Sequence, residues 1–408
     1  MKLAWHWRRK RSIQRLLLAA FPLSVWAFVL LGGTDATATT PQVLGDTVIL
    51  GYNDLGMHCM GNSFSELCVL PPANTMRATV IDRSGEHPVI VTEGITISYE
   101  IPGNTTSVTK TNFWQYAEQL FGVHLAPDIG LFGNGLTGSL TRTADKDWMV
   151  EGVPITPIRD DGVLDPYQLA TLTVRAGSVV KATTRAVMPV SWEMNCNLCH
   201  STRGITVETD ILRKHDQLHG TNLENQKPVL CARCHADPAL GAPGDPNLPN
   251  LSAAMHGSHA ARWPKTMPKG MTRDQYANKC YFCHPGFKTQ CERDMHRAGS
   301  SCIRCHGDMA AVGDPTRRPW VDLPKCGTCH SVANHEYEEP GKRYRDSRGH
   351  GGVKCEACHG SPHSLYPTVQ PNDNVQSIAL QGHAGKIDTC SVCHSTPPHD
   401  PFFHRRED

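Results

Sequence analysis

The stretch EMNCNLCHST, residues 193–202, places two cysteines three positions apart and a histidine directly after the second one. Cys196, Cys199 and His200 could form half of a zinc site, a redox-active dithiol or an attachment point for haem. The same CxxCH pattern occurs seven times, and the seven segments are called triplets 1 to 7 in chain order. They begin at residues 196, 231, 280, 302, 326, 355 and 390.

The regular repetition of the triplet separates these three kinds of chemistry. A structural zinc site takes four ligands in tetrahedral geometry and does not need a histidine after every CxxC pair. A thioredoxin-type dithiol occurs once, beside a βαβ pattern that this sequence lacks. Covalent haem attachment does need the triplet, because two thiols bond the vinyl groups of one porphyrin and the adjacent histidine binds its iron. The sequence therefore predicts seven covalently bound c-type haems, with zinc as the alternative.

This prediction gives every triplet residue a role. The thioether anchors are Cys196, Cys199, Cys231, Cys234, Cys280, Cys283, Cys302, Cys305, Cys326, Cys329, Cys355, Cys358, Cys390 and Cys393. The proximal iron ligands are His200, His235, His284, His306, His330, His359 and His394.

Residues 191–408 carry all seven triplets and show little helix or strand periodicity. The uneven spacing of the triplets does not fit a solenoid repeat. So little polypeptide is available for each haem that the porphyrins themselves would form the apolar core. We expect a mostly irregular domain with short helices, packed around the haems.

Residues 39–190 have a different composition, with only two cysteines. Short β-branched runs bounded by turn residues predict an all-β, sandwich-like domain that serves in docking or assembly. These runs are residues 46–52, 75–85, 88–101 and 169–177. Residues 110–122 predict a short amphipathic helix that ends at a glycine. A last predicted strand runs directly toward Cys196, so triplet 1 would follow this domain without a flexible linker.

The first 38 residues follow the plan of a secretory signal peptide. A cationic start is followed by an apolar run from Leu16 to Leu31 and by small residues, and we expect cleavage after Ala38. The alternative is an uncleaved anchor, because the apolar run approaches the length needed to span a bilayer. No later stretch of the sequence could span one. We expect the mature protein in the periplasm or outside the cell, where its 17 cysteines would have to be capped.

The region 191–408 resembles the multihaem c-type cytochromes, which are periplasmic or extracellular electron carriers. The resemblance implies closely stacked haems that mostly have two axial histidines, with low reduction potentials compared with Met/His ligation. In many such proteins a phrase like CHGSPHSLYP, residues 358–367, supplies a distal ligand to a neighbouring haem, here His363. The resemblance does not extend to residues 39–190.

Histidines outside the triplets are numerous enough to supply a distal ligand to every iron. Our preferred distal ligands are His219, His256, His259, His296, His350, His363 and His383. Within this set, His256 and His259 form the segment HGSH, so one turn of chain could serve two adjacent irons. The histidines expected to be spectators are His215, His335, His399 and His404. Met255 and Met295 are alternatives as soft axial ligands.

Three cysteines lie outside the triplets: Cys59, Cys68 and Cys291. Cys59 and Cys68 are close in sequence, and we expect a disulfide between them. The alternative is a soft-metal site, because the segment GMHCMG, residues 56–61, offers thiol, imidazole and thioether groups. For Cys291 a buried thiol, an intermolecular bridge and a haem ligand all stay open.

These features predict an electron carrier: electrons enter at one exposed haem, pass along the stack and leave to a redox partner protein. The alternative is a multihaem reductase of nitrite, hydroxylamine or a sulfur oxyanion, in which one haem keeps an open axial position. The supply of histidines and the absence of a CxxCK variant favour the carrier. A homo-oligomer or filament that passes electrons between copies is a third candidate. The formal net charge is +1 without a concentrated basic patch in the mature chain, so a nucleic-acid partner is not expected.

Overall fold

A computed structural model describes residues 42–267, 279–294, 302–330, 337–401 and 404. These residues belong to one compact unit, which begins at Ala38. The predicted signal peptide, residues 1–38, lies outside the described residues, as do the candidate ligands His296, His335 and Met295. Among the described residues, no helix is both long enough and apolar enough to cross a membrane.

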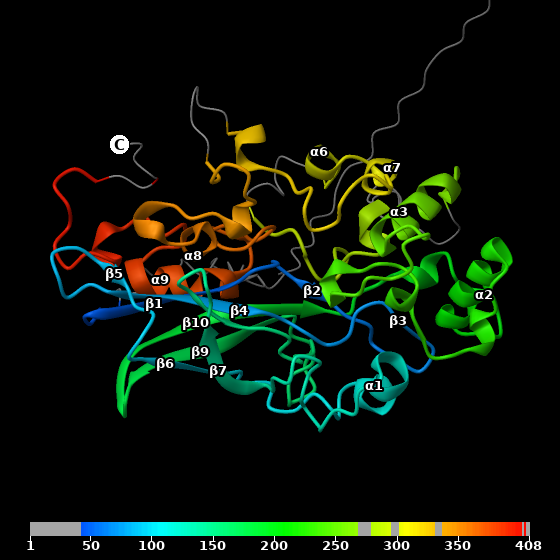
Figure 1. The fold of residues 1–408 in the computed structure, drawn as a ribbon, viewed down its shortest axis with the longest axis horizontal. Coiled ribbons are helices and arrows are strands. Elements are labelled where there is room, and N and C mark those ends of the chain that lie inside the picture. The colour runs from blue at the N-terminus through cyan, green and yellow to red at the C-terminus, as the bar shows by residue number, and fades with distance from the viewer. Residues whose placement is uncertain (1–41, 268–278, 295–301, 331–336, 402–403, 405–408) are drawn as a thin grey trace, which may run out of the picture. The chain divides into compact units, whose positions relative to one another are not determined.

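The first half of the chain forms one nine-stranded sheet (Figure 1). Its strands are β1 Thr47–Asn53, β2 His58–Cys59, β4 Met76–Asp82, β5 Val89–Ile90, β6 Thr96–Glu100, β7 Thr137–Arg142, β8 Trp148–Val150, β9 Tyr167–Ala176 and β10 Val179–Ser191. Their order in the sheet is β1, β4, β8, β7, β6, β9, β10 and β2, and β5 pairs with β4. All pairs are antiparallel except that β2 runs parallel to β10, which makes the sheet mixed.

The sheet is curled into a half-barrel. It curls so far that β1, at one end of the strand order, packs against β10 near the other end. Gly51 in β1 permits this approach, because a Cβ there would lie 2.5 Å from Cδ1 of Leu172 and 3.1 Å from Cβ of Ala186. The main hydrophobic core fills the space that the curled strands enclose, and it includes Ile49 and Met76. The prediction of a β-rich first half is confirmed.

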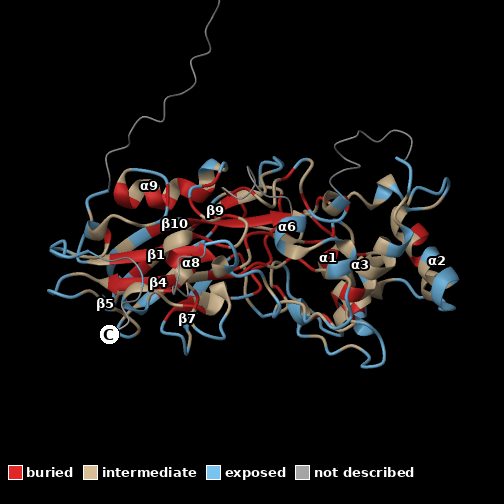
Figure 2. Ribbon diagram, turned by 90° about the horizontal axis from the view of Figure 1, so that it is seen from above, coloured by how far each residue is buried: buried red, intermediate tan, exposed pale blue. Residues whose placement is uncertain are grey.

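The strand β1 is buried on both of its faces, although a strand at a sheet surface usually alternates between buried and exposed residues. One face belongs to the main core. On the other face Val48 and Leu50 pack with Ala357, Leu380 and Val392 from the second half of the chain. Figure 2 shows the resulting band of buried residues through β1, β9 and β10. The second half therefore covers the sheet as a layer with its own apolar contacts.

The one α-helix in the described residues of the first half is α1, Phe113–Phe121. Its buried face consists of Phe113, Ala117 and Leu120, at the spacing expected for an amphipathic helix. Gly122 ends the helix in the left-handed conformation, with φ 71°, and its amide donates to the carbonyl of Glu118. The helix predicted over residues 110–122 is confirmed, including its glycine stop.

The second half of the chain has short helices joined by irregular segments, as predicted. The described α-helices outside the triplets are α2 Val207–His219, α3 Leu251–Arg262, α7 Met309–Val312 and α9 Val375–Gln381. The helical turns at the triplets are η1 Cys196–Leu198, η3 Cys231–Arg233, η5 Lys279–Phe282, α6 Cys302–His306, η6 Cys326–Thr328, α8 Cys355–His359 and η10 Cys390–Val392. The other 3-10 turns are η2 Leu223–Asn225, η4 Pro238–Leu240, η7 Tyr344–Asp346, η8 His350–Gly352 and η9 Pro371–Asn374.

Further contacts between elements of the two halves lie outside the layer on β1. The short strands β3, Leu67–Cys68, and β11, Val229–Leu230, pair in parallel just before triplet 2. The helix α9 and the turn η9 pack against β10. The sheet is thus the scaffold on which the triplet-bearing half is laid out.

Candidate functional site

Each triplet folds as one helical turn that brings its three functional side chains to one side. In triplets 1, 2, 3, 5 and 7 the amide of the histidine donates to the carbonyl of the first cysteine, at 2.8 to 3.0 Å. Triplets 4 and 6 form the α-helical turns α6 and α8. Residues three and four positions apart on a helical turn lie on the same face. Both thiols and the imidazole of a triplet can therefore act on one planar group.

Six of the seven triplet histidines face a second histidine across a nearly constant gap. The ring centroids of the pairs are 5.9 to 6.4 Å apart. The pairs are His200 with His259, His235 with His215, His284 with His256, His306 with His363, His359 with His404 and His394 with His350. With metal–nitrogen bonds of about 2 Å, two imidazoles on opposite sides of one metal ion have centroids about 6 Å apart.

The helix α3 supplies two of the facing rings from one turn. His256 faces triplet 3 and His259 faces triplet 1. The Nδ1 atom of His256 lies 2.8 Å from the carbonyl oxygen of Ser252, and Nδ1 of His259 lies 2.7 Å from that of Met255. Because a carbonyl oxygen only accepts hydrogen bonds, Nδ1 of each ring carries the proton. The lone pair of Nε2 is then free to bind a metal ion, which is the usual arrangement for a metal-binding imidazole.

Gly257, between these two histidines, explains why the segment reads HGSH. The helix α3 packs against α7, which follows triplet 4. A Cβ on Gly313, at the end of α7, would lie 2.3 Å from the backbone nitrogen of Gly257. Only two glycines allow the backbones to come this close. The contact places His256 near His306 of triplet 4, and the two imidazoles interact electrostatically.

Burial keeps the buried imidazoles of these pairs neutral. It lowers the pKa values of His284, His359 and His363 to about 4. The neutral imidazole, with a free lone pair, is the form that binds a metal ion. At neutral pH these rings are therefore ready to act as ligands.

His363 is held in a conformation that is uncommon for a residue other than glycine. Its φ is 64°, in the left-handed region. The amide of Arg293 donates to the carbonyl of His363 at 2.9 Å, and the carbonyl of Arg293 accepts from the amide of Val369 at 2.8 Å. Arg293 is fully buried, and its guanidinium is paired with Asp373. The surrounding segment thus fixes the ring that faces triplet 4.

The expected distal ligands are placed as follows. His256, His259, His350 and His363 each face a triplet histidine, whereas His219 and His383 face none in the described part of the chain. The ring of His219 lies 4.8 Å from that of His215, which is the one that faces triplet 2. His383 is half exposed, with Nε2 3.7 Å from a carboxylate oxygen of Asp388.

His215 and His404, expected to be spectators, occupy the facing positions of triplets 2 and 6. His215 and His219 lie four residues apart on the same face of α2, and the sequence carries no signal that chooses between them. His404 reaches triplet 6 from the end of the chain, where sequence spacing says nothing about contacts. His399 is exposed.

Triplet 5 differs from the other six in its described surroundings. The ring of His330 lies 6.3 Å from the ring of Tyr337, which in turn lies 5.9 Å from that of His404. The candidate ligands His296 and His335 lie outside the described residues.

Contacts between thiols show which triplets are neighbours in space. Burial, followed by the nearby thiols of Cys196 and Cys199, raises the pKa of Cys283 to about 12, so triplets 1 and 3 are adjacent. The thiols of Cys280 and Cys302 are hydrogen bonded, which joins triplets 3 and 4. Electrostatic interactions also link the thiols of Cys305 and Cys329, of Cys326 and Cys355, and of Cys358 and Cys393. Triplets 4, 5, 6 and 7 therefore follow one another in space as they do in sequence.

Triplet 2 is joined to triplet 1 through the helix α2. Asp210 on α2 interacts with His200 of triplet 1, and His215 on the same helix faces His235 of triplet 2. Five residues of α-helix span about 7.5 Å. The spatial order of the triplets is thus 2, 1, 3, 4, 5, 6 and 7, with triplets 2 and 7 at the ends.

A carboxylate near the end of β10 fixes triplet 1 against the loop after triplet 3. Glu193 is buried, and its carboxylate accepts from the amides of Phe287 at 2.9 Å, Lys288 at 2.9 Å and Thr289 at 2.6 Å. Because β10 ends at Ser191, only four residues separate the sheet from triplet 1. Sequence reasoning missed Glu193, since a single Glu beside a triplet has no distinguishing pattern.

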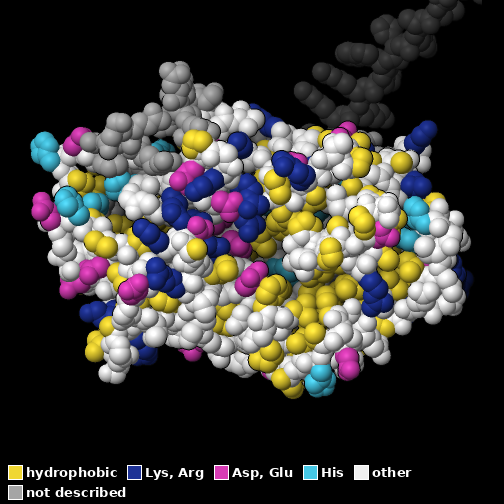
Figure 3. Space-filling model, in the orientation of Figure 1, with side chains coloured by type: hydrophobic (Ala, Val, Ile, Leu, Met, Phe, Trp, Pro, Cys, Tyr) yellow, Lys and Arg dark blue, Asp and Glu magenta, His cyan; other side chains and the backbone are white. Residues whose placement is uncertain are grey.

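A cavity of about 820 Å³ lies beside triplets 4 and 5. Cys305, His306 and Thr328 of the two triplets line it together with a strongly basic wall. The basic residues are Arg317, Arg318, Lys325, Lys342 and Arg343, and the acidic ones are Asp322 and Asp346. Figure 3 shows that Lys and Arg side chains, interspersed with Asp and Glu, gather on the face that carries α8. Such a cavity suits a large apolar group that carries negative charges at its edge.

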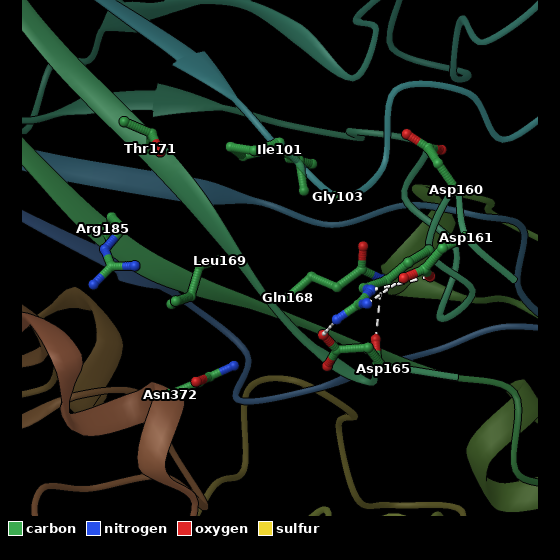
Figure 4. Close-up of a pocket in the computed structure, with 12 residues that line it drawn as sticks. Ile101, Gly103, Asp160, Asp161, Asp165, Gln168, Leu169, Thr171, Arg185 and Asn372 are labelled. Atoms are coloured by element: carbon green, nitrogen blue, oxygen red, sulfur yellow. Dashed lines mark hydrogen bonds and ion pairs between the residues drawn. The ribbon is translucent and has the colours of Figure 1, made fainter. Parts of the chain in front are cut away.

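A second cavity, of about 530 Å³, lies on the sheet and contains no triplet residue (Figure 4). Asp160, Asp161 and Asp165 line one side of it, and Arg185 and Asn372 lie on the other. Its charges are largely satisfied internally or by residues nearby. Arg159, for example, pairs with Asp161, and Lys110 pairs with Asp160 at 2.8 Å. This cavity shows no chemistry comparable to that of the triplets.

All 17 cysteines have free thiols in the structure, including Cys59, Cys68 and Cys291. Cys59 and Cys68, which we expected to form a disulfide, lie on strands with different partners, since β2 pairs with β10 and β3 pairs with β11. In the GMHCMG segment, Nε2 of His58 lies 2.7 Å from the carbonyl oxygen of Pro71. Within the described residues, no group of three or more His, Cys, Asp or Glu side chains is arranged to hold a metal ion.

A comparison with protein-family models and with curated proteins found no match for this chain.

Proposed function

We propose that the protein is a heptahaem c-type cytochrome that transfers electrons. The observation that carries the proposal is the set of six triplet histidines that each face a second histidine at 5.9 to 6.4 Å. A haem iron takes four nitrogens from the porphyrin and needs only two protein ligands, on opposite sides. Isolated pairs of facing imidazoles suit this requirement, whereas a zinc site draws four ligands together.

The residues around the triplets fit haem in size and charge. The cysteines of each triplet would form the thioether bonds, and its histidine would be the proximal ligand. In the cavity beside triplets 4 and 5, the side chains of Arg317, Lys325 and Arg343 are placed among those that would neutralise haem propionates. Bound haem supplies one-electron chemistry, and the protein supplies ligands, burial and spacing.

The facing pairs revise the set of distal ligands that we propose. His259, His215, His256, His363, His404 and His350 would serve triplets 1, 2, 3, 4, 6 and 7. For triplet 5 the preferred ligand His296 remains the candidate. A reductase needs an open axial position, and in these six pairs an imidazole would occupy each of the two positions. Electron transfer is therefore favoured over catalysis.

The spatial order of the triplets supports a single path for electrons. Triplets 2 and 7 would carry the terminal haems, and redox partner proteins would exchange electrons there. The curled sheet would act as the scaffold that holds the haems of this path at fixed positions. Secretion, to the periplasm or to the cell exterior, follows from the predicted signal peptide and from the way c-type haem is attached after export.

The haem content and the iron spin states test this proposal. Intact mass and a pyridine haemochrome assay of the exported protein should give seven covalent haems per chain. The electron paramagnetic resonance spectrum of the oxidised protein should be low-spin for at least six of them. Fewer covalent haems, or zinc in their place, would contradict the haem assignment. Several high-spin irons and a spectral shift with carbon monoxide or nitrite would instead favour the reductase.

A further inference from the structure

Three thiols remain after the fourteen triplet cysteines are assigned: Cys59, Cys68 and Cys291. We infer that Cys59 and Cys291 form a disulfide in the mature protein, which links the sheet to the triplet-bearing half. The two residues are far apart in sequence, and neither the motif GMHCMG nor the lone Cys291 points to the other. Their meeting is a property of the fold.

The strand β10 brings the two cysteines to one place. Cys59, on β2, is in parallel register with Ser191 of β10. The hydroxyl of Ser191 lies 3.2 Å from the hydroxyl of Thr289, and Glu193 accepts from the amide of Thr289 at 2.6 Å. Cys291 is two residues beyond Thr289. The end of β10 therefore contacts both the strand of Cys59 and the segment that leads to Cys291.

Arg293 fixes the same two segments from a second direction. Its Nη1 atom donates to the carbonyl of Gly56 at 2.8 Å and to the carbonyl of Cys291 at 3.2 Å. The amide of Cys291 donates to the carbonyl of Pro285, which holds the other side of the loop. One buried guanidinium thus ties together the backbones just before Cys59 and at Cys291. The contacts at the end of β10 and the hydrogen bonds of Arg293 both hold these two segments. The fold therefore sets the distance between the segment of Cys59 and the segment of Cys291.

The side chains themselves interact. Burial is the largest cause that raises the pKa of Cys59, and the thiol of Cys291 is the next cause. Burial also raises the pKa of Cys291 to about 11. Two half-buried thiols that interact in this way are suited to bond to each other, because the disulfide carries no charge and needs no hydrogen-bond donor.

The third thiol belongs to a different environment. Cys68 is buried and in register with Leu230 of β11, and its nearest interacting thiol is that of Cys231 in triplet 2. Cys231 would be occupied by its haem. This leaves Cys68 as the single reduced thiol and Cys291 as the partner of Cys59.

The reaction is a thiol–disulfide exchange with an external disulfide. The thiolate of Cys59 or Cys291 attacks the external disulfide and forms a mixed disulfide, and one external thiol leaves. The second cysteine then displaces the other external thiol. The two cysteines lose two protons and two electrons, and the external disulfide becomes two thiols. The inference rests on the proposed export, because such a disulfide donor is found outside the cytoplasm.

Peptide mapping of the exported, haem-loaded protein tests the inference directly. The protein is denatured without reductant, alkylated, digested and analysed by mass spectrometry. We expect a cross-linked peptide that contains Cys59 and Cys291, and alkylation of Cys68. Alkylation of both Cys59 and Cys291, or a peptide that joins Cys59 to Cys68, would overturn the inference. The haem count is measured on the same sample, so that loss of the disulfide is distinguished from failure of the haem proposal.

Single and double variants provide the second test. C59S should expose one new alkylatable thiol, at Cys291, and C291S one at Cys59. Each single variant and the double variant C59S/C291S should lower the midpoint of thermal unfolding by the same several degrees. The matched control C68S removes the one free thiol without releasing another. If the double variant lowered the midpoint of thermal unfolding by the sum of the two single effects, the two thiols would be independent. That result would overturn the inference.

Discussion

Arg293 and Asp373 form a completely buried ion pair in which two parallel hydrogen bonds join the guanidinium to the carboxylate. Nε of Arg293 lies 2.5 Å from Oδ2 of Asp373, and Nη2 lies 3.0 Å from Oδ1. Both side chains have 0 % exposure. The pair sits where the sheet, the segment of Cys291 and the segment of His363 converge, and the guanidinium also lies over the ring of Tyr167. It determines how the two halves of the chain are joined.

Removal of the arginine should therefore destabilise the protein and disturb one haem. R293M leaves the carboxylate of Asp373 buried without its partner, which should lower the free energy of unfolding by about 3–5 kcal/mol. The freed segment of His363 should also add a high-spin signal from triplet 4. Chemical unfolding and electron paramagnetic resonance measure the two effects.

The exposed pair of Arg142 and Glu93 offers a matched control for this variant. Its arginine side chain is 47 % exposed, and R142M should cost about 1 kcal/mol or less without a change of spin state. An equally small cost for R293M would show that the buried pair does not join the halves.

The facing position of His404 predicts a ligand at the end of the chain. H404A should convert one haem, that of triplet 6, from low-spin to high-spin and raise its reduction potential, because an axial imidazole is lost. The control is H399A, which alters an exposed histidine five residues away. Optical and electron paramagnetic resonance spectra distinguish the variants. An unchanged low-spin spectrum of H404A would remove His404 from the ligand set.

The helix α2 predicts a second contrast, between two histidines on one face. H215A should produce one high-spin haem, since His215 faces His235 across 6.4 Å. H219A should keep all irons low-spin while it removes a ring that packs against His215. The reverse result would assign the distal position of triplet 2 to His219.

Glu356 predicts a pH dependence of stability. It lies within triplet 6 with 0 % exposure, and neither of its carboxylate oxygens has a hydrogen-bond partner among the described residues. Burial, and then Asp54, raise its pKa well above 4.5, and Arg345, Arg77 and Lys354 oppose this only partly. At pH values between 4.5 and the raised pKa, the unfolded chain ionises and the folded chain does not. The free energy of unfolding therefore falls as the pH rises through this range.

E356Q removes this ionisation, so it should be more stable than the wild type at pH 7 by an amount on the order of 1 kcal/mol, and the difference should vanish near pH 4. Chemical unfolding at both pH values measures it. E86Q, at an exposed position, is the control and should show no such dependence. A difference that stays constant from pH 4 to pH 7 would contradict a buried neutral carboxyl.

The parts of this structure that depend on local sequence could be predicted, and those that depend on long-range contacts could not. The helix over residues 110–122 followed from apolar spacing and a glycine, which act within a few residues. The turn of each triplet follows in the same way from its own residues. The curl of the sheet was not visible, because it depends on Gly51 meeting Leu172 and Ala186.

The site residues divide in the same way. His256 and His259 could be assigned together because one helical turn holds both. His404 could not, since its approach to His359 depends on the course of the whole second half. The expected disulfide between Cys59 and Cys68 rested on nearness in sequence, whereas the two strands that carry these cysteines pair with different partners.

The burial of β1 on both faces has a consequence for biogenesis. This strand is synthesised early, yet the side chains that cover its outer face, Ala357, Leu380 and Val392, come from the last part of the chain. Until those segments arrive, Val48 and Leu50 remain open to solvent on an incomplete sheet. The sheet would therefore finish folding only after the last triplets are in place, which gives chaperones and haem-attachment machinery a common interval in which to act.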